Sequence, residues 1–368
     1  MKFTTSVSTM QGVTSNLSNG VGNDKMLPIT GLVGIECLPN KRVEFTVTDY
    51  VNYLTVAIEL GDDDEEYEEG YATVSADMMI KLVSKCRSGE TISFELFEDK
   101  YLAVESGGVY KLELADDGSG ELVHFVNPGK QFKVEDCTEY VIDTKTLNEM
   151  VSSCKQALYP DKSEVYSNYL ISNKVVATDR TRAVFINSDI VGDKPEILLD
   201  STIVDLFLLF GDDVTLKVGN DSIYATNSAG TIVVFSKADS SVGEYNVNGT
   251  KAMLGIKFPS MCKLNKTDVI TALNRIGLFC AKYEDNALSM EFKEGSVVLS
   301  SANSSAIEEI GYLEFKDVKT CTILIDIKKL LAHLKGYPSE TVELHFGADK
   351  CIMLEDKDIT QIIALVRR

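Results

Sequence analysis

Histidine, cysteine and carboxylate side chains could carry catalysis or hold a metal in this chain, but their spacing favours neither. The three histidines, His124, His333 and His345, show no metal-ligand spacing among themselves. The eight cysteines are at least 17 residues apart, so the sequence has no CxxC pair. Walker A, GxGxxG, GxSxG and HExxH motifs are all missing. We therefore expect no catalytic residue, no metal site and no cofactor.

The acidic run at 62–69 is a separate candidate for cation binding. Its carboxylates do not follow the ligand spacing of an EF-hand loop. A block of like charges is more typical of a solvated loop, because the charges repel one another and favour water. We interpret this run as a loop between strands.

Basic side chains gather in segments whose apolar residues recur with a helical period. These segments cover residues 5–20, 76–88, 143–157, 200–210, 263–282 and 326–336. Together they hold twelve Lys and Arg against seven Asp and Glu, a net +5 in a chain whose total charge is −20. The first and fourth segments hold no basic residue. If the six helices line one surface, that surface is positive on an acidic protein; otherwise their charges only keep each helix soluble.

The helical period also predicts which side of each segment is buried. In 76–88 the predicted inner face holds Met78, Leu82 and Cys86, with Lys81 and Lys85 on another face. In 263–282 it holds Val269, Leu273, Ile276 and Cys280, with Thr271, Arg275, Leu278 and Lys282 opposite. In 326–336 it holds Ile327, Leu330, Leu331 and Leu334, with Lys329 and His333 opposite.

Helix and strand patterns recur three times along the 368 residues. In each repeat, two units follow one another, and each unit is a short helix followed by β-rich runs joined by turn residues. Thr48-Asp49, Thr178-Asp179 and Ala302-Asn303 fall at matching points, and Asp200 and Asp326 are expected N-caps. We predict an α+β fold of three similar domains at about 1–125, 126–250 and 251–368, each with two helices packed on antiparallel sheets.

Five short segments, in register with these repeats, resemble one known family. They are Met1-Lys2-Phe3, Leu27-Pro28-Ile29, the segment at 175–185, Phe258-Pro259 and the C-terminal IIALVRR. Along the whole chain the sequence resembles the β sliding clamp of bacterial DNA polymerase III. The resemblance implies a processivity factor without catalysis, built as a head-to-tail homodimer whose helices line a hole for DNA.

The resemblance also implies a pocket for short linear peptides of DNA polymerase and the clamp loader. The matching positions are Tyr166, Thr178, Arg182, Pro259, Ile362, Ile363, Ala364, Leu365 and Val366. The chain departs from the family pattern at Arg180-Thr181 (usually Gly-His), at Ala183 (Leu) and at Ala364-Leu365 (Met-Pro). Alternatively, Thr178 and Arg182 belong to an ordinary turn, and Ile362, Ile363 and Val366 complete a last strand.

Contacts with double-stranded DNA, independent of its sequence, are expected from Lys25, Lys81, Lys85, Arg275, Lys282 and Lys329. Lys25 or Asp24, and Asp77, replace arginines that the family has at these places. The dimer interface is expected at Lys111, Leu278, Phe279, Glu308 and Glu309, with Lys111 facing the two glutamates.

We find no signal peptide or membrane span and expect a cytoplasmic, nucleoid-associated protein. The alternative is a clamp-like protein that competes for replication partners without encircling DNA; an enzyme with an unusual site is a distant third.

Overall fold

The computed structural model describes residues 1–22, 24–61, 66–98, 100–118, 120–125, 127–133, 137–219, 221–237, 245–280 and 286–366. The acidic run at 62–69 lies partly outside this range, and Lys282 lies outside it altogether. The chain divides into two compact units. One consists of Met1–Thr144 and Thr202–Ser240, and the other of Lys145–Ser201 and Ser241–Arg368.

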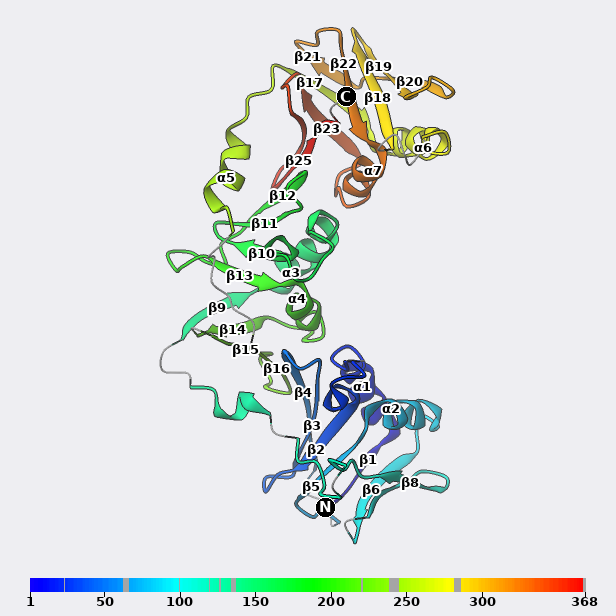
Figure 1. Cartoon of the computed structure of the whole chain (residues 1–368), viewed down its shortest axis with the longest axis vertical. Helices are drawn as coiled ribbons and strands as arrows, with labels where there is room; N and C mark the ends of the chain where they lie inside the picture. Colours follow the sequence, from blue (N-terminus) through cyan, green and yellow to red (C-terminus); the bar gives the residue numbers. More distant parts are fainter. Residues whose placement is uncertain are drawn as a thin grey trace. The chain divides into compact units, whose positions relative to one another are not determined.

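The first unit holds two antiparallel sheets (Figure 1). The smaller has the order β1 (Lys2–Ser6), β6 (Thr91–Phe97), β7 (Tyr101–Glu105), β8 (Val109–Glu113). The larger has the order β5 (Gly70–Ser75), β2 (Leu32–Cys37), β3 (Arg42–Thr48), β4 (Asn52–Glu59), β16 (Ile232–Ser236), β15 (Ile223–Thr226), β14 (Val214–Val218), β9 (Thr138–Ile142).

The second unit repeats this plan. Its larger sheet has the order β13 (Ile197–Asp200), β10 (Asn168–Ile171), β11 (Lys174–Thr178), β12 (Arg182–Asn187), β25 (Ile359–Ala364), β24 (Cys351–Asp356), β23 (Thr341–Phe346), β17 (Ser260–Asn265), β21 (Glu314–Lys316). Its smaller sheet has the order β20 (Ile307–Gly311), β19 (Ser296–Ser301), β18 (Ala287–Lys293), β22 (Cys321–Asp326).

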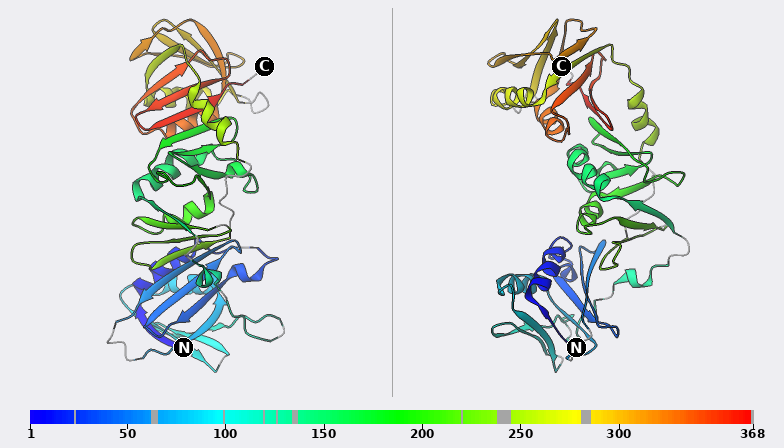
Figure 2. Two further views of the ribbon diagram at one scale, coloured as in Figure 1. Left: turned by 90° about the vertical axis from the view of Figure 1, so that its left-hand side faces the viewer. Right: turned by 180° about the vertical axis from the view of Figure 1, so that it is seen from behind.

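The α-helices are α1 (Val7–Leu17), α2 (Ala76–Lys85), α3 (Thr144–Glu149), α4 (Ser201–Phe207), α5 (Val247–Ala252), α6 (Lys266–Ile276) and α7 (Ile327–Lys335). Six of them lie in the predicted helical segments, and α3 continues as a π-turn, Met150–Cys154, and a 3-10 turn, Lys155–Ala157. In the first unit α1 packs on α2, and in the second α6 packs on α7 (Figure 2). Helix α5 was not predicted. No helix in the described part of the chain is long and apolar enough to cross a membrane.

The strand order recurs three times, as the sequence repeats predict. A meander of three strands followed by a flanking strand occurs as β2-β3-β4 with β5, as β10-β11-β12 with β13, and as β18-β19-β20 with β22. A second meander occurs as β6-β7-β8 with β1, as β14-β15-β16 with β9, and as β23-β24-β25 with β17. The α+β class is confirmed, while the boundaries near residues 125 and 250 stay a prediction.

The repeats are joined through edge strands. β4 pairs with β16 in the first unit, and β12 pairs with β25 in the second, each joint being antiparallel. By position in the repeat, β8 corresponds to β16 and β25, and β20 corresponds to β4 and β12. Within the described residues, β8 and β20 each end a sheet with no strand on the outer side.

The predicted buried faces were right for α6 and partly wrong for α2 and α7. In α2 the buried residues are Ala76, Met79 and Val83, whereas Met78 is exposed. The buried face of α2 is shifted by one residue from the predicted one, because packing against α1, β2 and β5 decides which side of the helix faces inward. In α7 His333 is fully buried beside Leu330 and Leu334, because a polar side chain can be buried when it finds a hydrogen-bond partner.

Candidate functional site

The turn between β11 and β12 carries Thr178 and Arg182. The Thr178 hydroxyl donates to the Arg182 carbonyl at 2.7 Å and accepts the Arg180 N–H at 3.1 Å. The Asp179 carboxylate accepts the N–H groups of Thr181 and Arg182 at 2.9 and 3.0 Å. Threonine and aspartate favour such turns because their short side chains bond to the backbone nearby. The turn is therefore fixed by its own side chains.

The same turn recurs between β3 and β4. Thr48 bonds to the Asn52 carbonyl at 2.7 Å, and Asp49 accepts the N–H groups of residues 51 and 52. The residue after the aspartate has a positive φ in both turns, 84° at Tyr50 and 72° at Arg180. The third repeat has a longer version at 301–306, built on Ser301 and Asn303. The matching dipeptides in the sequence thus mark one repeated turn.

Arg182 is held by the turn itself. Its Nε donates to Asp179 Oδ2 at 2.8 Å, and both side chains are largely buried. Charge-assisted pairs of this kind fix a guanidinium in one orientation. Thr178 is buried as well. Thr178 and Arg182 thus belong to a strand-turn-strand, and their role in a peptide pocket stays a prediction. Any contact of Arg182 with a peptide would use the guanidinium N–H groups not bonded to Asp179.

The C-terminal segment runs beside this turn as β25. Ile362 and Ile363 are buried on opposite faces of the sheet, Ile362 opposite Ala183 and Ile363 opposite Arg182. The half-buried residues that follow are also hydrogen-bonded. The N–H groups of Ala364, Leu365 and Val366 donate to the carbonyls of Thr181, Lys350 and Leu324, each at 2.8 Å. These two isoleucines thus complete the last strand, and the half-buried tail continues from it.

Tyr166 lies in the apolar cluster that contains Ile362. Its ring packs on Tyr245 with a centroid distance of 4.9 Å. The Arg180 guanidinium lies 4.6 Å from the centre of the Tyr166 ring and pairs with Glu164 at 3.1 Å. Pro259 is exposed next to Phe258, a partly buried member of the same cluster. The structure therefore gathers most of the predicted pocket residues around β12 and β25, with an unexpected cation, Arg180, beside them.

A buried polar pair joins α7 to β25. His333 Nδ1 is 3.0 Å from Gln361 Oε1, and no other partner is found for His333 Nε2 or Gln361 Nε2 among the described residues. Burial is the main cause that lowers the pKa of His333 from 6.5 to about 4, and the nearby Arg182 charge adds to it. The imidazole is therefore neutral at physiological pH. Sequence analysis missed this pair because nothing links His333 to Gln361 before β25 is placed against α7.

The predicted DNA-contact residues are exposed or half-buried where the structure describes them. Lys25 lies in the turn before Pro28, and Lys81 and Lys85 lie on α2, all exposed. Lys81 pairs with Asp77 at 2.8 Å. Arg275 on α6 donates to Glu308 through Nε at 2.8 Å, and Lys329 on α7 donates to the Thr181 hydroxyl at 2.6 Å.

The predicted interface residues lie on the two open strands and after α6. Lys111 is exposed on β8, with its ammonium 4.4 Å from the Tyr101 ring centre. On β20, Glu308 is already paired with Arg275 of the same chain, and Glu309 accepts from the Ser296 hydroxyl at 2.5 Å. Leu278 is 84% exposed and Phe279 51%. Ile307 on β20 and Val109 on β8 add exposed apolar surface that sequence analysis did not single out.

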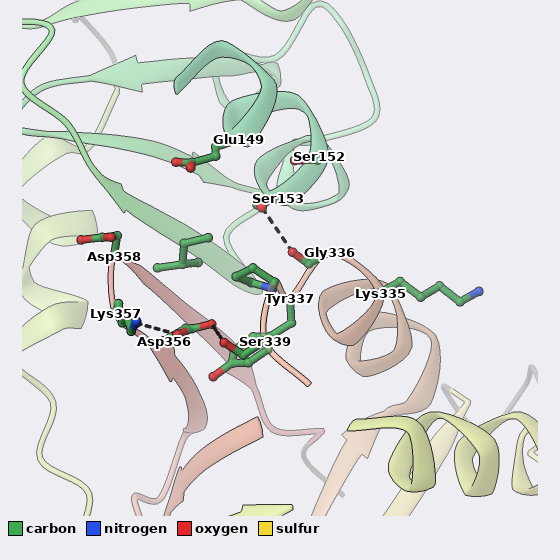
Figure 3. A pocket seen from close by; sticks show the side chains of 12 residues that line it. Glu149, Ser152, Ser153, Lys335, Gly336, Tyr337, Ser339, Asp356, Lys357 and Asp358 are labelled. Atoms are coloured by element: carbon green, nitrogen blue, oxygen red, sulfur yellow. Dashed lines mark hydrogen bonds between the residues drawn. The ribbon is translucent and has the colours of Figure 1, made fainter. Parts of the chain in front are cut away.

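A cavity of about 490 Å³ in the second unit also escaped prediction (Figure 3). It is lined by Glu149, Ser152 and Ser153, by residues 335–339 at the C-terminal end of α7, and by residues 356–359 between β24 and β25. Ser153 donates to the Gly336 carbonyl at 3.2 Å across one side. None of the predicted site residues lines it.

Comparison with known proteins finds similarity to solved structures. No family model and no curated protein matches the chain. Among solved structures, the Bacillus subtilis DNA polymerase sliding clamp matches with a TM-score of 0.83 at 17% identity, over 100% of this chain and 99% of that one. The DNA polymerase III beta chain of Streptococcus pneumoniae (18% identity) and the beta subunit of Pseudomonas aeruginosa (16%) give the same TM-score over the full length of both chains. The chain therefore has the fold of the bacterial DNA polymerase III beta sliding clamps.

Proposed function

We propose that this protein is a DNA sliding clamp, a non-catalytic ring of two chains that encircles duplex DNA and tethers replication proteins. The observation that carries the proposal is the pair of open strands, β8 and β20. Every other strand in their positions is joined to the next repeat, β4 to β16 and β12 to β25. A second chain placed head to tail would supply the equivalent β20–β8′ joint at both ends and close the ring.

The apolar residues around these strands support an interface there. Val109 on β8 is 62% exposed, Ile307 on β20 is 60% exposed, and Leu278 lies beyond α6. Large apolar side chains left exposed at an open strand edge, as at each of these two edges, are typical of protein–protein contacts. Covering them with a second chain would remove that apolar surface from water and satisfy the open strand edges.

DNA would be held through the basic residues of the helices, without reading base edges. Contacts of lysine and arginine with phosphates fix position but carry no sequence information. The net charge of −20 would disfavour DNA on other surfaces of the protein. Peptides of polymerase and clamp loader would dock near Tyr166, Arg180 and the half-buried segment 364–366, where apolar and cationic groups meet.

A second function, partner binding without encirclement, is favoured by one specific observation. Two of the predicted DNA-contact cations are already neutralised within the chain, Lys81 by Asp77 and Arg275 by Glu308. Helices α1 and α4 hold no basic residue. A weakly positive lining would reduce affinity for DNA and leave the peptide site intact.

Retention on circular DNA separates the two functions without a clamp loader. The protein is diluted to a concentration at which dimers exchange chains and is mixed with nicked circular DNA. The mixture is then concentrated, and the rings are closed covalently with a zero-length carbodiimide cross-linker. A clamp stays on the circle in high salt and is released when one restriction cut linearises the DNA. If the protein is lost from both circular and linear DNA while peptide binding is retained, the second function is favoured. If circular and linear DNA retain the protein equally, topological binding is excluded.

A further inference from the structure

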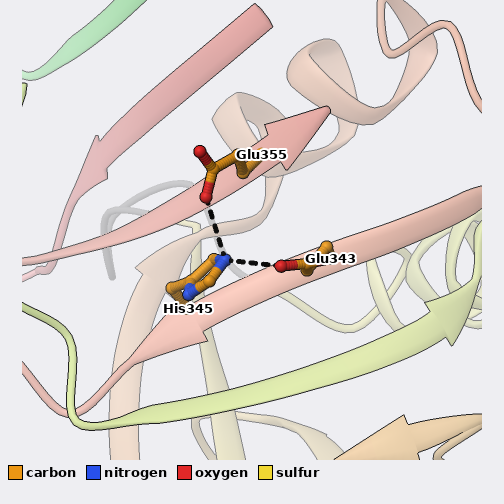
Figure 4. A group of neighbouring side chains, drawn as sticks. All are labelled: Glu343, His345 and Glu355. Carbon is orange, nitrogen blue, oxygen red and sulfur yellow. Dashed lines mark hydrogen bonds and ion pairs between the residues drawn. The ribbon is translucent and has the colours of Figure 1, made fainter. Parts of the chain in front are cut away.

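Two glutamates and a histidine meet on one face of the large sheet of the second unit (Figure 4). Glu343 and His345 are two residues apart on β23, so their side chains lie on the same face. Glu355 on β24 is directly opposite Glu343 in the antiparallel register. The backbone pairing therefore sets the positions of all three side chains.

The three side chains converge on one ring nitrogen. His345 Nε2 lies 3.0 Å from Glu343 Oε1 and 3.3 Å from Glu355 Oε2, and all three atoms lie within 4.8 Å of one another. Two ligands bound at about 2.1 Å to a tetrahedral ion lie roughly 3.4 Å apart. The nitrogen–oxygen distances are thus those of atoms that can share one metal ion after small side-chain rotations.

Within the cluster, one N–H of His345 can serve only one of the two carboxylates at a time. Nε2 carries at most one hydrogen, but two carboxylates approach it. Directly opposed like charges destabilise a sheet. In the described chain, no lysine or arginine pairs with Glu343 or Glu355, although Lys263 is opposite Glu343 on β17. A cation between the three groups would offset this repulsion.

The donor set limits the kind of cation. One imidazole nitrogen with two carboxylate oxygens suits zinc and similar divalent transition metals, whereas magnesium and calcium prefer oxygen ligands throughout. A hollow of about 440 Å³ borders the two carboxylates; Lys263 and Lys357 also line it, and His345 does not. A water in this hollow would supply the fourth ligand. The His345 side chain is only 18% exposed, which restricts its motion.

We propose that Glu343, His345 and Glu355 form a binding site for one divalent transition-metal ion, with zinc the best match. The ion links β23 to β24 and neutralises the two opposed carboxylates. This inference rests on side-chain geometry and is independent of any role in DNA replication.

The test is a zinc titration of the full-length, chelator-treated protein by calorimetry. We expect one zinc per chain, with affinity at least about tenfold weaker in each of His345→Ala, Glu343→Gln and Glu355→Gln. His124→Ala and Glu294→Gln, which alter exposed residues elsewhere, serve as matched controls and should bind as the original protein does. Unchanged affinity in the three site variants overturns the proposal.

Two further measurements cover misfolding and competing ligands. The zinc-induced rise in Tm, taken relative to each variant's own metal-free Tm, should occur in the original protein and vanish in the site variants. Because the chain has eight free cysteines, Co²⁺ is used as a second probe. A thiolate-to-cobalt absorption band would assign the ion to cysteine and overturn the site, and spectra without that band support it.

Discussion

At the residue scale, His333 makes the stability of the fold depend on pH. Its pKa is about 4 in the folded chain and about 6.5 when unfolded, so the unfolded state binds more protons between these values. The fold is therefore fully stabilised above pH 6.5 and loses stability as the pH falls toward 4. A depression of this size corresponds to about 3 kcal/mol at most.

We predict that His333→Gln flattens this dependence. Glutamine can still bond to Gln361 but cannot take up a proton. Urea unfolding at several values between pH 5 and 6.5, where most carboxylates are still ionised, should show a falling unfolding free energy for the original protein and a flatter curve for the variant. The replacement of exposed His124 by Gln is the control. Parallel curves for His333→Gln and the original protein would show that His333 is not responsible.

At the element scale, the proposed β20–β8′ joint is open to a direct chemical test. Lys111 on β8 and Glu309 on β20 are both exposed, and Glu308 is occupied by Arg275. If the joint forms, carbodiimide should link the Lys111 amine mainly to the Glu309 carboxyl of a second chain. Digestion and mass spectrometry would detect the linked peptides.

Lys111→Arg is the matched control for this cross-link. Arginine keeps the positive charge but forms no stable amide, so the linked peptide should vanish while the dimer persists in light scattering. Leu278→Asp should give monomers, because it places a charge in the apolar contact. A Leu278→Asp protein that remains dimeric would place the interface elsewhere.

The same elements show which parts of the fold were predictable. Local signals were sufficient for the six helices and for the repeated turn, because the Thr178-Asp179 turn is made by its own side chains. Contacts distant in sequence were not predictable. Glu355 is opposite Glu343 because of the register between β23 and β24, and Gln361 is buried against His333 because β25 lies beside α7. A polar residue on a helix therefore looks solvent-facing until its distant partner is known.

At the scale of the whole molecule, an acidic chain can hold DNA only through a local excess of positive charge. On α2 the two lysines differ, since Lys81 is paired with Asp77 at 2.8 Å and Lys85 has no ion-pair partner among the described residues. A cation already neutralised by a carboxylate releases fewer counterions when it meets a phosphate. The lysines of α2 should therefore contribute unequally to the salt dependence of DNA binding.

We predict that Lys85→Gln lowers the slope of log K against log salt by about 0.9 for each phosphate that the protein no longer neutralises, and Lys81→Gln by less. The slope is measured by fluorescence anisotropy with short duplexes of two unrelated sequences, which should behave alike. Lys100→Gln, in the turn between β6 and β7, replaces a lysine paired with Glu98 and should leave the slope unchanged. Equal effects of all three replacements would mean that DNA binding depends only on the total charge of the protein. An unchanged slope for Lys85→Gln would mean that Lys85 of α2 does not contact DNA.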